Sequence, residues 1–264
     1  MIAFGILAWL VDGYDAIFVL SFSLAAVGVA VLVFFVPGAP PRAASGNAPV
    51  PNAKKPQVKE KKRLRRALRE FAGLAGDVRY RRLLGVGAVL SLTTISDGFI
   101  YLTLNDRVGM GAVLFPLLFV GTAAAYLVLA VPLGRLADRI GRVQVFLGGH
   151  AVAALGYLGL WLLPAGPALV IGVLALIGTY YAATDGVLPA LTAPLVPENL
   201  RTTGIAGVQT VMAVGGMLSA VLFGIVWSQF GQLTAVALFA AGLAAAIGLA
   251  TRLLLERPAG RITR

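Results

Sequence analysis

Long apolar runs separated by short polar stretches dominate the pattern of hydrophobic and polar positions along this chain. A bilayer core about 30 Å thick is crossed by roughly 20 apolar residues, because each helical residue rises about 1.5 Å. Runs of this length lie at residues 16–36, 83–104, 111–133, 143–163, 168–191, 203–228 and 233–250. The pattern therefore predicts an all-α, polytopic membrane protein with about seven transmembrane helices.

The composition also indicates that the chain lies in a lipid bilayer, which is its first expected partner. The 264 residues are 59% hydrophobic and 12% charged, and the mean hydropathy is +0.89, values foreign to ordinary water-soluble domains. Cysteine is absent and His150 is the single histidine, so neither disulfides nor a cysteine and histidine metal site can form. No cofactor or metal is expected.

The positions of the basic residues change the meaning of the net charge of +11. They lie between and beside the apolar runs rather than along one soluble face, so no nucleic-acid partner is predicted. Lysine and arginine are retained on the cytoplasmic side of short loops. With residues 37–82 inside, 21 of the 22 basic residues fall on that side and Arg107 alone lies outside. We expect a cell-membrane protein whose long linker and C-terminus are cytoplasmic.

The runs divide the chain into four parts. Residues 1–36 hold a partial apolar helix, at 1–11, and one full span. Residues 37–82 form a proline-rich and alanine-rich cytoplasmic linker that ends in a basic amphipathic helix. Residues 83–251 hold six spans, and residues 252–264 form a cytoplasmic tail.

A short internal match divides those six spans into two groups of three. Ser96, Asp97 and Gly98 in the first span recur as Thr184, Asp185 and Gly186 in the fourth. Three crossings invert the second copy relative to the first, as in transporters built from inverted repeats. The match predicts a three-plus-three inverted repeat whose copies each open with an acidic helix.

Asp97 and Asp185 are the candidates for chemistry. An acidic side chain at bilayer depth costs about 2.5 to 3.5 kcal/mol on insertion scales and is tolerated against protein or a water-filled cavity. No span contains a lysine or arginine to pair with them. Apolar surroundings disfavour the charged carboxylate, so either residue is a candidate to bind and release a proton.

Neighbouring hydroxyl groups extend each acidic position into a polar patch. Tyr101 follows Asp97 by four residues, Tyr181 precedes Asp185 by four, and Thr184 adds a hydroxyl. Residues four apart share a helix face. The simpler alternative is that each aspartate is protonated, bonds a neighbouring helix and only fixes packing.

The loop at residues 134–142 is the most specific local motif. Glycines permit a tight reversal, arginines hold the loop inside, and an aspartate can pair with an arginine. Gly134, Asp138, Gly141 and Arg142 match the signature Gly-x-x-x-Asp-x-x-Gly-Arg, with Arg139 inside it. In this the chain resembles the major facilitator superfamily, and residues 197–201, which include Arg201, look like that family's next inside loop.

The resemblance implies that residues 16–36 and 83–250 correspond to helices six to twelve of a twelve-helix transporter, with residues 1–11 the end of helix five. Asp97, Tyr101, Tyr181 and Asp185 would line the central cavity, and Asp138 would act at the cytoplasmic gate. Helices one to four have no counterpart, so a separate N-terminal half is an expected partner. The implied function is secondary active, alternating-access export of a small molecule, with a proton as candidate coupling ion, by a truncated or half transporter.

Other classes of function fit less well. A non-transporting seven-span sensor, interaction module or inactive fragment stays open, although a retinal-type chromophore is excluded because no span holds a lysine. An intramembrane aspartyl protease needs two adjacent carboxylates, whereas Asp97 and Asp185 are expected about 21 Å and about 9 Å from the inner edge. No phosphate-binding Gly-x-x-x-x-Gly-Lys loop is present for ATP-driven transport. No enzymatic activity is expected.

Overall fold

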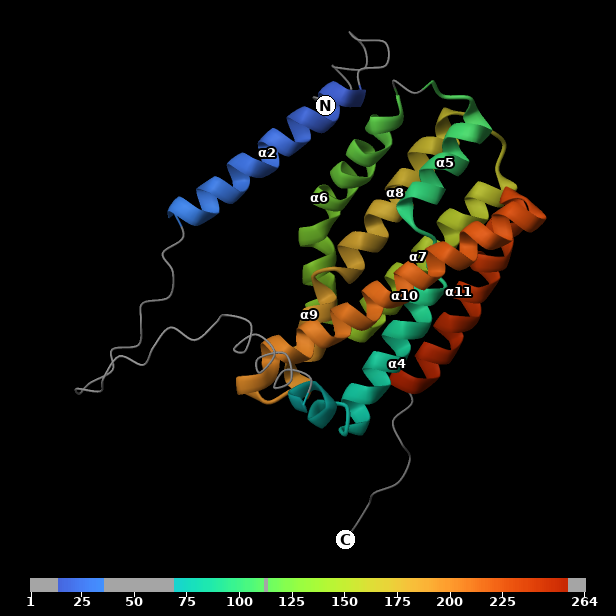
Figure 1. Ribbon diagram of the computed structural model, residues 1–264. Helices are drawn as coiled ribbons and strands as arrows, with labels where there is room; N and C mark the ends of the chain where they lie inside the picture. Colours follow the sequence, from blue (N-terminus) through green and yellow to red (C-terminus); the bar gives the residue numbers. More distant parts are fainter. Residues whose placement is uncertain (1–13, 36–68, 112–113, 256–264) are drawn as a thin grey trace.

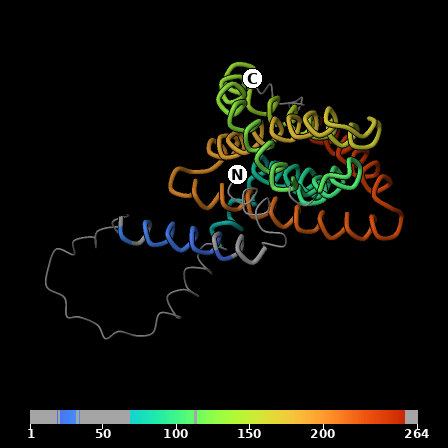
Figure 2. The backbone as a smooth tube through the Cα atoms, turned by 90° about the horizontal axis from the view of Figure 1, so that it is seen from above, coloured from blue at the N-terminus to red at the C-terminus, as the bar shows by residue number. Residues whose placement is uncertain are grey.

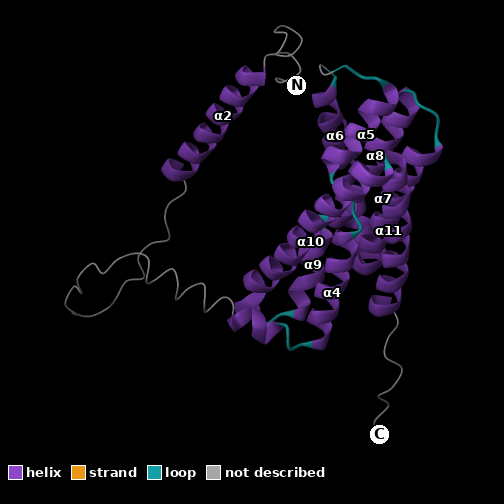
Figure 3. Cartoon of the chain, turned by 45° about the vertical axis from the view of Figure 1, so that its right-hand side comes forward, coloured by secondary structure: helices purple, strands orange, loops and turns teal. Residues whose placement is uncertain are grey.

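A computed structural model describes residues 14–35, 69–111 and 114–255 of the chain (Figure 1). Within these ranges the chain forms helices joined by short loops and contains no strand (Figure 3). The helices are α2 (Tyr14–Phe35), α4 (Val78–Leu92), α5 (Asp97–Val108), α6 (Phe115–Ile140), α7 (Arg142–Leu162), α8 (Pro167–Thr184), α9 (Val187–Thr192), α10 (Arg201–Phe230) and α11 (Gln232–Leu255). Two 3-10 turns, Ala193–Leu195 and Glu198–Leu200, connect α9 to α10.

Six of the seven predicted spans are confirmed as helical segments long and apolar enough to cross a membrane. These segments are Val78–Val108, Phe115–Ile140, Arg142–Leu162, Pro167–Leu195, Glu198–Phe230 and Gln232–Leu255. The described residues therefore form a polytopic, all-α bundle. It begins at Val78, inside the stretch expected to be linker, because Asp77 caps α4 by accepting hydrogen bonds from the backbone N–H groups of Arg79 and Tyr80.

The first predicted span falls in α2, a helix of 22 residues. Its described apolar stretch, Ser21–Val31, is shorter than a full span, so a seventh crossing stays a prediction. The side chains described in this helix are exposed, and Figures 1 and 2 show it beside the bundle rather than packed into it. The partial helix expected at 1–11 and the amphipathic helix up to residue 68 lie outside the described residues.

The two spans that carry the aspartates are interrupted. Residues 93–96 separate α4 from α5 partway along the bundle (Figure 3), and Asp185 and Gly186 separate α8 from α9. The first break lies where the hydroxyls of Thr93 and Thr94 both bond to the carbonyl of Leu90, at 3.0 and 2.7 Å. Such side-chain bonds compete with the helical ladder. Each acidic residue therefore lies at a helix end rather than inside a continuous helix.

Packing follows the three-plus-three inverted repeat. In the first copy α6 and α7 follow the broken helix α4–α5, and in the second α10 and α11 follow α8–α9. Helices α6 and α7 pack against α8, whereas α10 and α11 pack against α4. Each broken helix is thus enclosed mainly by the two unbroken helices of the other copy, while α7 and α11 contact each other. This exchange of partners is what a two-fold relation between the copies requires.

Small residues permit the closest of these contacts. A Cβ atom at Gly178 of α8 would lie 2.5 Å from the Cβ of Ala125 and 2.7 Å from the backbone oxygen of Thr122, both in α6. A Cβ at Gly149 of α7 would lie 2.7 Å from the Cβ of Ala183 in α8. Helices in lipid associate through such close backbone approach, because burying apolar side chains gains little there.

The charges of the bundle are distributed unequally between its two ends. The end that carries the start of α4 and the α6–α7 turn holds nine of the ten arginines in the described ranges, namely Arg69, Arg79, Arg81, Arg82, Arg135, Arg139, Arg142, Arg201 and Arg252. Arg107, at the opposite end, donates to the carbonyl oxygens of Leu160 and, at 2.7 Å, Leu163. Arg107 therefore donates to backbone carbonyl groups that have no partner within the helix at the end of α7.

Candidate functional site

Asp97 and Tyr181 join the two broken helices directly. The Tyr181 hydroxyl, in α8, donates a 2.7 Å hydrogen bond to Oδ1 of Asp97, the first residue of α5. Both residues line a hollow of about 350 Å³. The rest of its lining comes from the end of α4, the α4–α5 break, α8 and α10, namely Ser91, Thr94, Ile95, Ser96, Tyr180, Met212 and Gly216.

Side chains from other helices hold the unwound stretch beside Asp97. The backbone N–H of Ile95 donates to the Tyr157 hydroxyl of α7 at 2.9 Å, and the Ser219 hydroxyl of α10 donates to the backbone oxygen of Thr94 at 2.5 Å. Non-helical backbone at membrane depth is stable only where protein groups or water satisfy it. Tyr157 and Ser219 therefore position Asp97, although sequence reasoning missed both. Their hydroxyls inside apolar runs were the available signal, but the sequence did not show which backbone groups they meet.

Tyr101 differs from its expected place beside Asp97. It is buried, its hydroxyl donates to Thr122 Oγ1 of α6 at 2.9 Å, and its ring packs edge-on against Phe119. It does not line the hollow that contains Asp97. Because α5 begins at Asp97, the carboxylate lies at an open helix end that reaches α8, while the phenol one turn later faces α6.

Asp185 lines a second hollow, of about 380 Å³, next to the first. Its lining consists of Phe146, Tyr180, Thr184, Asp185, Leu188, Gln209 and Met212, so Tyr180 and Met212 are shared by the two hollows. Thr184 is buried and its hydroxyl donates to the carbonyl of Tyr180, its own helix, at 2.8 Å. Asp185 is exposed. The partner expected for it, Tyr181, bonds Asp97 instead.

The only histidine lies behind the second hollow. His150 is fully buried between the rings of Phe146 and Tyr180, and its Nδ1 donates to the carbonyl oxygen of Phe146 at 2.8 Å. Within the described part of the chain, Nε2 has no hydrogen-bond partner. No lysine, arginine or histidine lines either hollow. The two aspartates therefore face space without a fixed cation.

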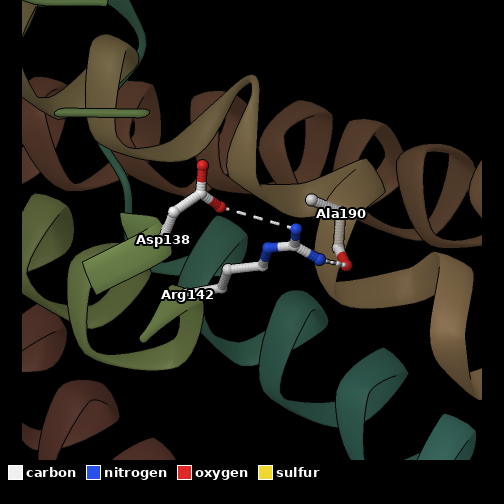
Figure 4. Close-up of polar contacts among 3 residues, drawn as sticks. All are labelled: Asp138, Arg142 and Ala190. Carbon is white, nitrogen blue, oxygen red and sulfur yellow. Dashed lines mark hydrogen bonds and ion pairs between the residues drawn. The ribbon is translucent and has the colours of Figure 1, made fainter. Parts of the chain in front are cut away.

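The signature loop connects the two copies at the arginine-rich end. Arg142 pairs with Asp138 at 3.5 Å and donates from Nη1 to the backbone oxygen of Ala190 in α9 at 2.9 Å (Figure 4). Gly141 has φ +107°, a conformation that favours glycine, and lets α7 begin directly after α6. Gly134 lines a third hollow, of about 320 Å³, together with Asp138 and Arg142.

The remaining residues of the predicted gate lie outside this bond network. Arg139 is exposed. Arg201 pairs with Glu198 at 3.5 Å across the turn that leads into α10, and both side chains are largely exposed to solvent. Exposed pairs of this kind contribute little to stability. The contact of Arg142 with α9, together with the ion pair between Arg142 and Asp138, is thus the part of the motif that joins one repeat to the other.

Comparison with known proteins adds one finding. A family model described as Major Facilitator Superfamily matches residues 83–264, which contain most of the six-span bundle, both aspartates and the signature loop. No curated protein and no solved structure matches the chain.

Proposed function

Because the chain belongs to the Major Facilitator Superfamily, whose members are membrane transporters rather than enzymes, we propose that it works in secondary active transport by alternating access, exporting a small molecule with a proton as the coupling ion. The observation that carries this proposal is the hydrogen bond between Tyr181 and Asp97, which connects the two broken helices inside a hollow.

Protonation of Asp97 changes the hydrogen bonds that its carboxyl group can form. The ionised carboxylate only accepts hydrogen bonds, whereas the protonated acid can also donate one. Asp97 is half-buried and lies beside a phenol rather than a cation. Loss or gain of a proton therefore alters the connection between α5 and α8. Because α5 and α8 belong to different copies of the repeat, the proton can influence how the copies sit relative to each other.

The signature loop supplies the second connection that must change during transport. Arg142 ties the α6–α7 turn to α9 through Ala190, while Asp138 holds its guanidinium from the other side. The positive-inside rule favours the cytoplasm for this arginine-rich end. We assign the contact to the cytoplasmic closure of the cavity and Asp97 to the interior, so that breaking one and remaking the other gives alternating access.

An N-terminal half, supplied mainly by a separate chain, is the partner that this bundle would use. Helices α6 and α10 are the least buried of its spans. They expose apolar side chains along one face each, including Leu127 and Val131 on α6 and Met217 and Val221 on α10. An N-terminal half placed against these faces would close the hollows that contain Asp97 and Asp185, with residues 16–36 as its last span.

The proposal is tested with the full chain in proteoliposomes that contain the pH-sensitive dye pyranine. Solutes from a panel of amines, sugars and organic acids are added outside, and solute-dependent proton movement is followed by fluorescence. We expect movement with at least one class, lost in Asp97→Asn and reduced in Tyr181→Phe. A hydrogen bond to a charged group contributes about 1.5 to 3 kcal/mol, so the Tyr181 variant should lose roughly tenfold or more in rate if this bond is specific to the transition state.

Asp106→Asn is the matched control, because Asp106 belongs to the same helix α5 but bonds Gln232 at the far end of the bundle. It should behave as the unmodified chain does. Equal proton movement in the Asp97→Asn and Asp106→Asn variants would refute the role of Asp97. Absence of solute-coupled proton movement from the unmodified chain would refute proton-coupled transport by this polypeptide.

A further inference from the structure

The side chain of Asp185 differs from that of Asp97 in having no partner within the described ranges. The Asp97 carboxylate accepts the Tyr181 hydroxyl, whereas Asp185 bonds only through its backbone N–H, to the carbonyl of Tyr181, and no hydrogen bond or ion pair joins its carboxylate to any described residue. The attraction between a carboxylate and a bound cation is stronger beside an apolar wall, because the wall screens the two charges less than water does. Asp185 is therefore available to a ligand in a way that Asp97 is not.

The walls around Asp185 are apolar and aromatic. Phe146, Leu188 and Met212 supply hydrocarbon and thioether surface, and Tyr180 lines both this hollow and the one beside Asp97. Aromatic faces attract cations, and methionine adapts to irregular apolar shapes. A hollow of about 380 Å³ is large enough for part of a small organic molecule.

The polar groups of the hollow disfavour other classes of solute. An anion would meet Asp185 in this hollow and Asp97 in the adjoining one, with no lysine, arginine or histidine in either lining. A sugar needs several donors and acceptors, whereas the neutral polar side chains of this lining are only Gln209, Tyr180 and Thr184, and the Thr184 hydroxyl already donates within its own helix. The charge and the wall chemistry therefore select a positively charged molecule with an apolar body.

We propose that this hollow binds an organic cation, an amine or quaternary ammonium compound with an apolar or aromatic body. The cationic centre lies against the Asp185 carboxylate, and the body lies against Tyr180 and Met212. The inference rests on the proposed function and narrows its substrate class. It also divides the two acidic residues between two tasks, with Asp185 binding the substrate and Asp97, held by Tyr181, carrying the proton.

The test measures binding rather than transport. The purified full chain in nanodiscs of zwitterionic lipid is titrated with radiolabelled tetraphenylphosphonium, a bulky cation, and separately with tetraphenylborate, an anion of the same shape. We expect saturable binding of the cation only. Asp185→Asn should weaken it about tenfold or more, Asp185→Glu should retain most of it, and Asp106→Asn should leave it unchanged. Asp97→Asn should weaken it less than Asp185→Asn, because the Asp97 carboxylate is already engaged by Tyr181.

The outcomes separate this inference from the proposed transport. Retained binding in Asp185→Asn, equal saturable binding of tetraphenylborate, or no saturable binding of the cation would each overturn the cation site. The Asp185→Glu variant controls for misfolding, since a folded chain that needs a carboxylate should recover binding with glutamate. Cation binding that depends on Asp185 without any coupled proton movement would support the site and refute the transport proposal. Proton movement with another solute but no cation binding would support the transport proposal and refute the cation site.

Discussion

Replacement of Gly178 by alanine tests whether the close contact between α6 and α8 holds the two repeats together. The added Cβ would lie 2.5 Å from the Cβ of Ala125, 2.7 Å from the oxygen of Thr122 and 3.0 Å from the backbone nitrogen of Tyr126. Carbon atoms in contact lie about 3.5 to 4.0 Å apart, so α8 must move away from α6 by about 1 Å. Two of the three obstacles are backbone atoms, which cannot rotate aside.

The size of the effect follows from two opposing contributions. Overpacking a close contact costs about 1 to 3 kcal/mol. Alanine in a helix interior is favoured over glycine by up to about 1 kcal/mol, which offsets part of that cost. Because two of the three obstacles are backbone atoms, we take the upper part of that cost, about 2 to 3 kcal/mol, and expect a net loss of about 1 to 2 kcal/mol. This loss is equivalent to several degrees in the apparent unfolding temperature, at about 2 to 4 °C per kcal/mol.

Gly172 in the same helix is the matched control. A Cβ atom at this position meets nothing within 4 Å, so Gly172→Ala keeps the gain in helix propensity without the clash. Thermal unfolding of both variants in the same detergent is followed by circular dichroism. We expect Gly178→Ala to unfold below the unmodified chain and Gly172→Ala at or above it. Unfolding of Gly178→Ala at or above the temperature of Gly172→Ala would refute the packing argument.

Two further predictions concern contacts between the repeats. Ser219→Ala leaves the Thr94 carbonyl at the α4–α5 break without its donor, so we expect the free energy of unfolding to fall by about 1 to 3 kcal/mol. Ser228→Ala removes an exposed bond within α10 and should leave the unfolding temperature unchanged. Equal unfolding temperatures for the two variants would show that Ser219 does not hold the break. Arg142→Ala removes the bond to α9, so hydrogen exchange of the amides at residues 187–192 should accelerate severalfold. Arg139→Ala, at an exposed position of the same loop, should leave this exchange unchanged. Equal exchange in both variants would refute the assignment of the cytoplasmic closure to the bond between Arg142 and α9.

The long spans were predictable because a single quantity, the length of an apolar run, decides them. The interruptions inside two of those spans were not. The bonds of Thr93 and Thr94 to the Leu90 carbonyl weaken the helix locally, but such threonines also occur in continuous membrane helices. The break is completed by the bonds of Ile95 with Tyr157 and of Thr94 with Ser219, in helices far away in the sequence. The sequence marks hydroxyl groups within apolar runs, but not which carbonyl or amide each one meets.

The candidate site shows the same limit at the level of single side chains. Asp97 and Asp185 could be selected because acidic groups are costly in lipid, and both line hollows. Spacing of four residues assigned Tyr101 to Asp97 and Tyr181 to Asp185. That rule holds along one helix, whereas the observed bond of Tyr181 crosses from α8 to α5. Tertiary packing, which brings the two broken helices together, decides the partner.

The exchange of packing partners between the copies bears on how the polypeptide enters the membrane. Within the bundle, the spans of α4 to α7 leave the ribosome before those of α8 to α11, yet α4 packs mainly against α10 and α11, and α6 and α7 pack mainly against α8. Until the second copy is inserted, the carbonyl of Thr94 lacks its donor from Ser219 and Asp97 lacks Tyr181. The first three spans are therefore expected to wait beside the insertion machinery, unpaired and open to water or chaperones, so that assembly of this bundle is a late event completed only as its last helices arrive.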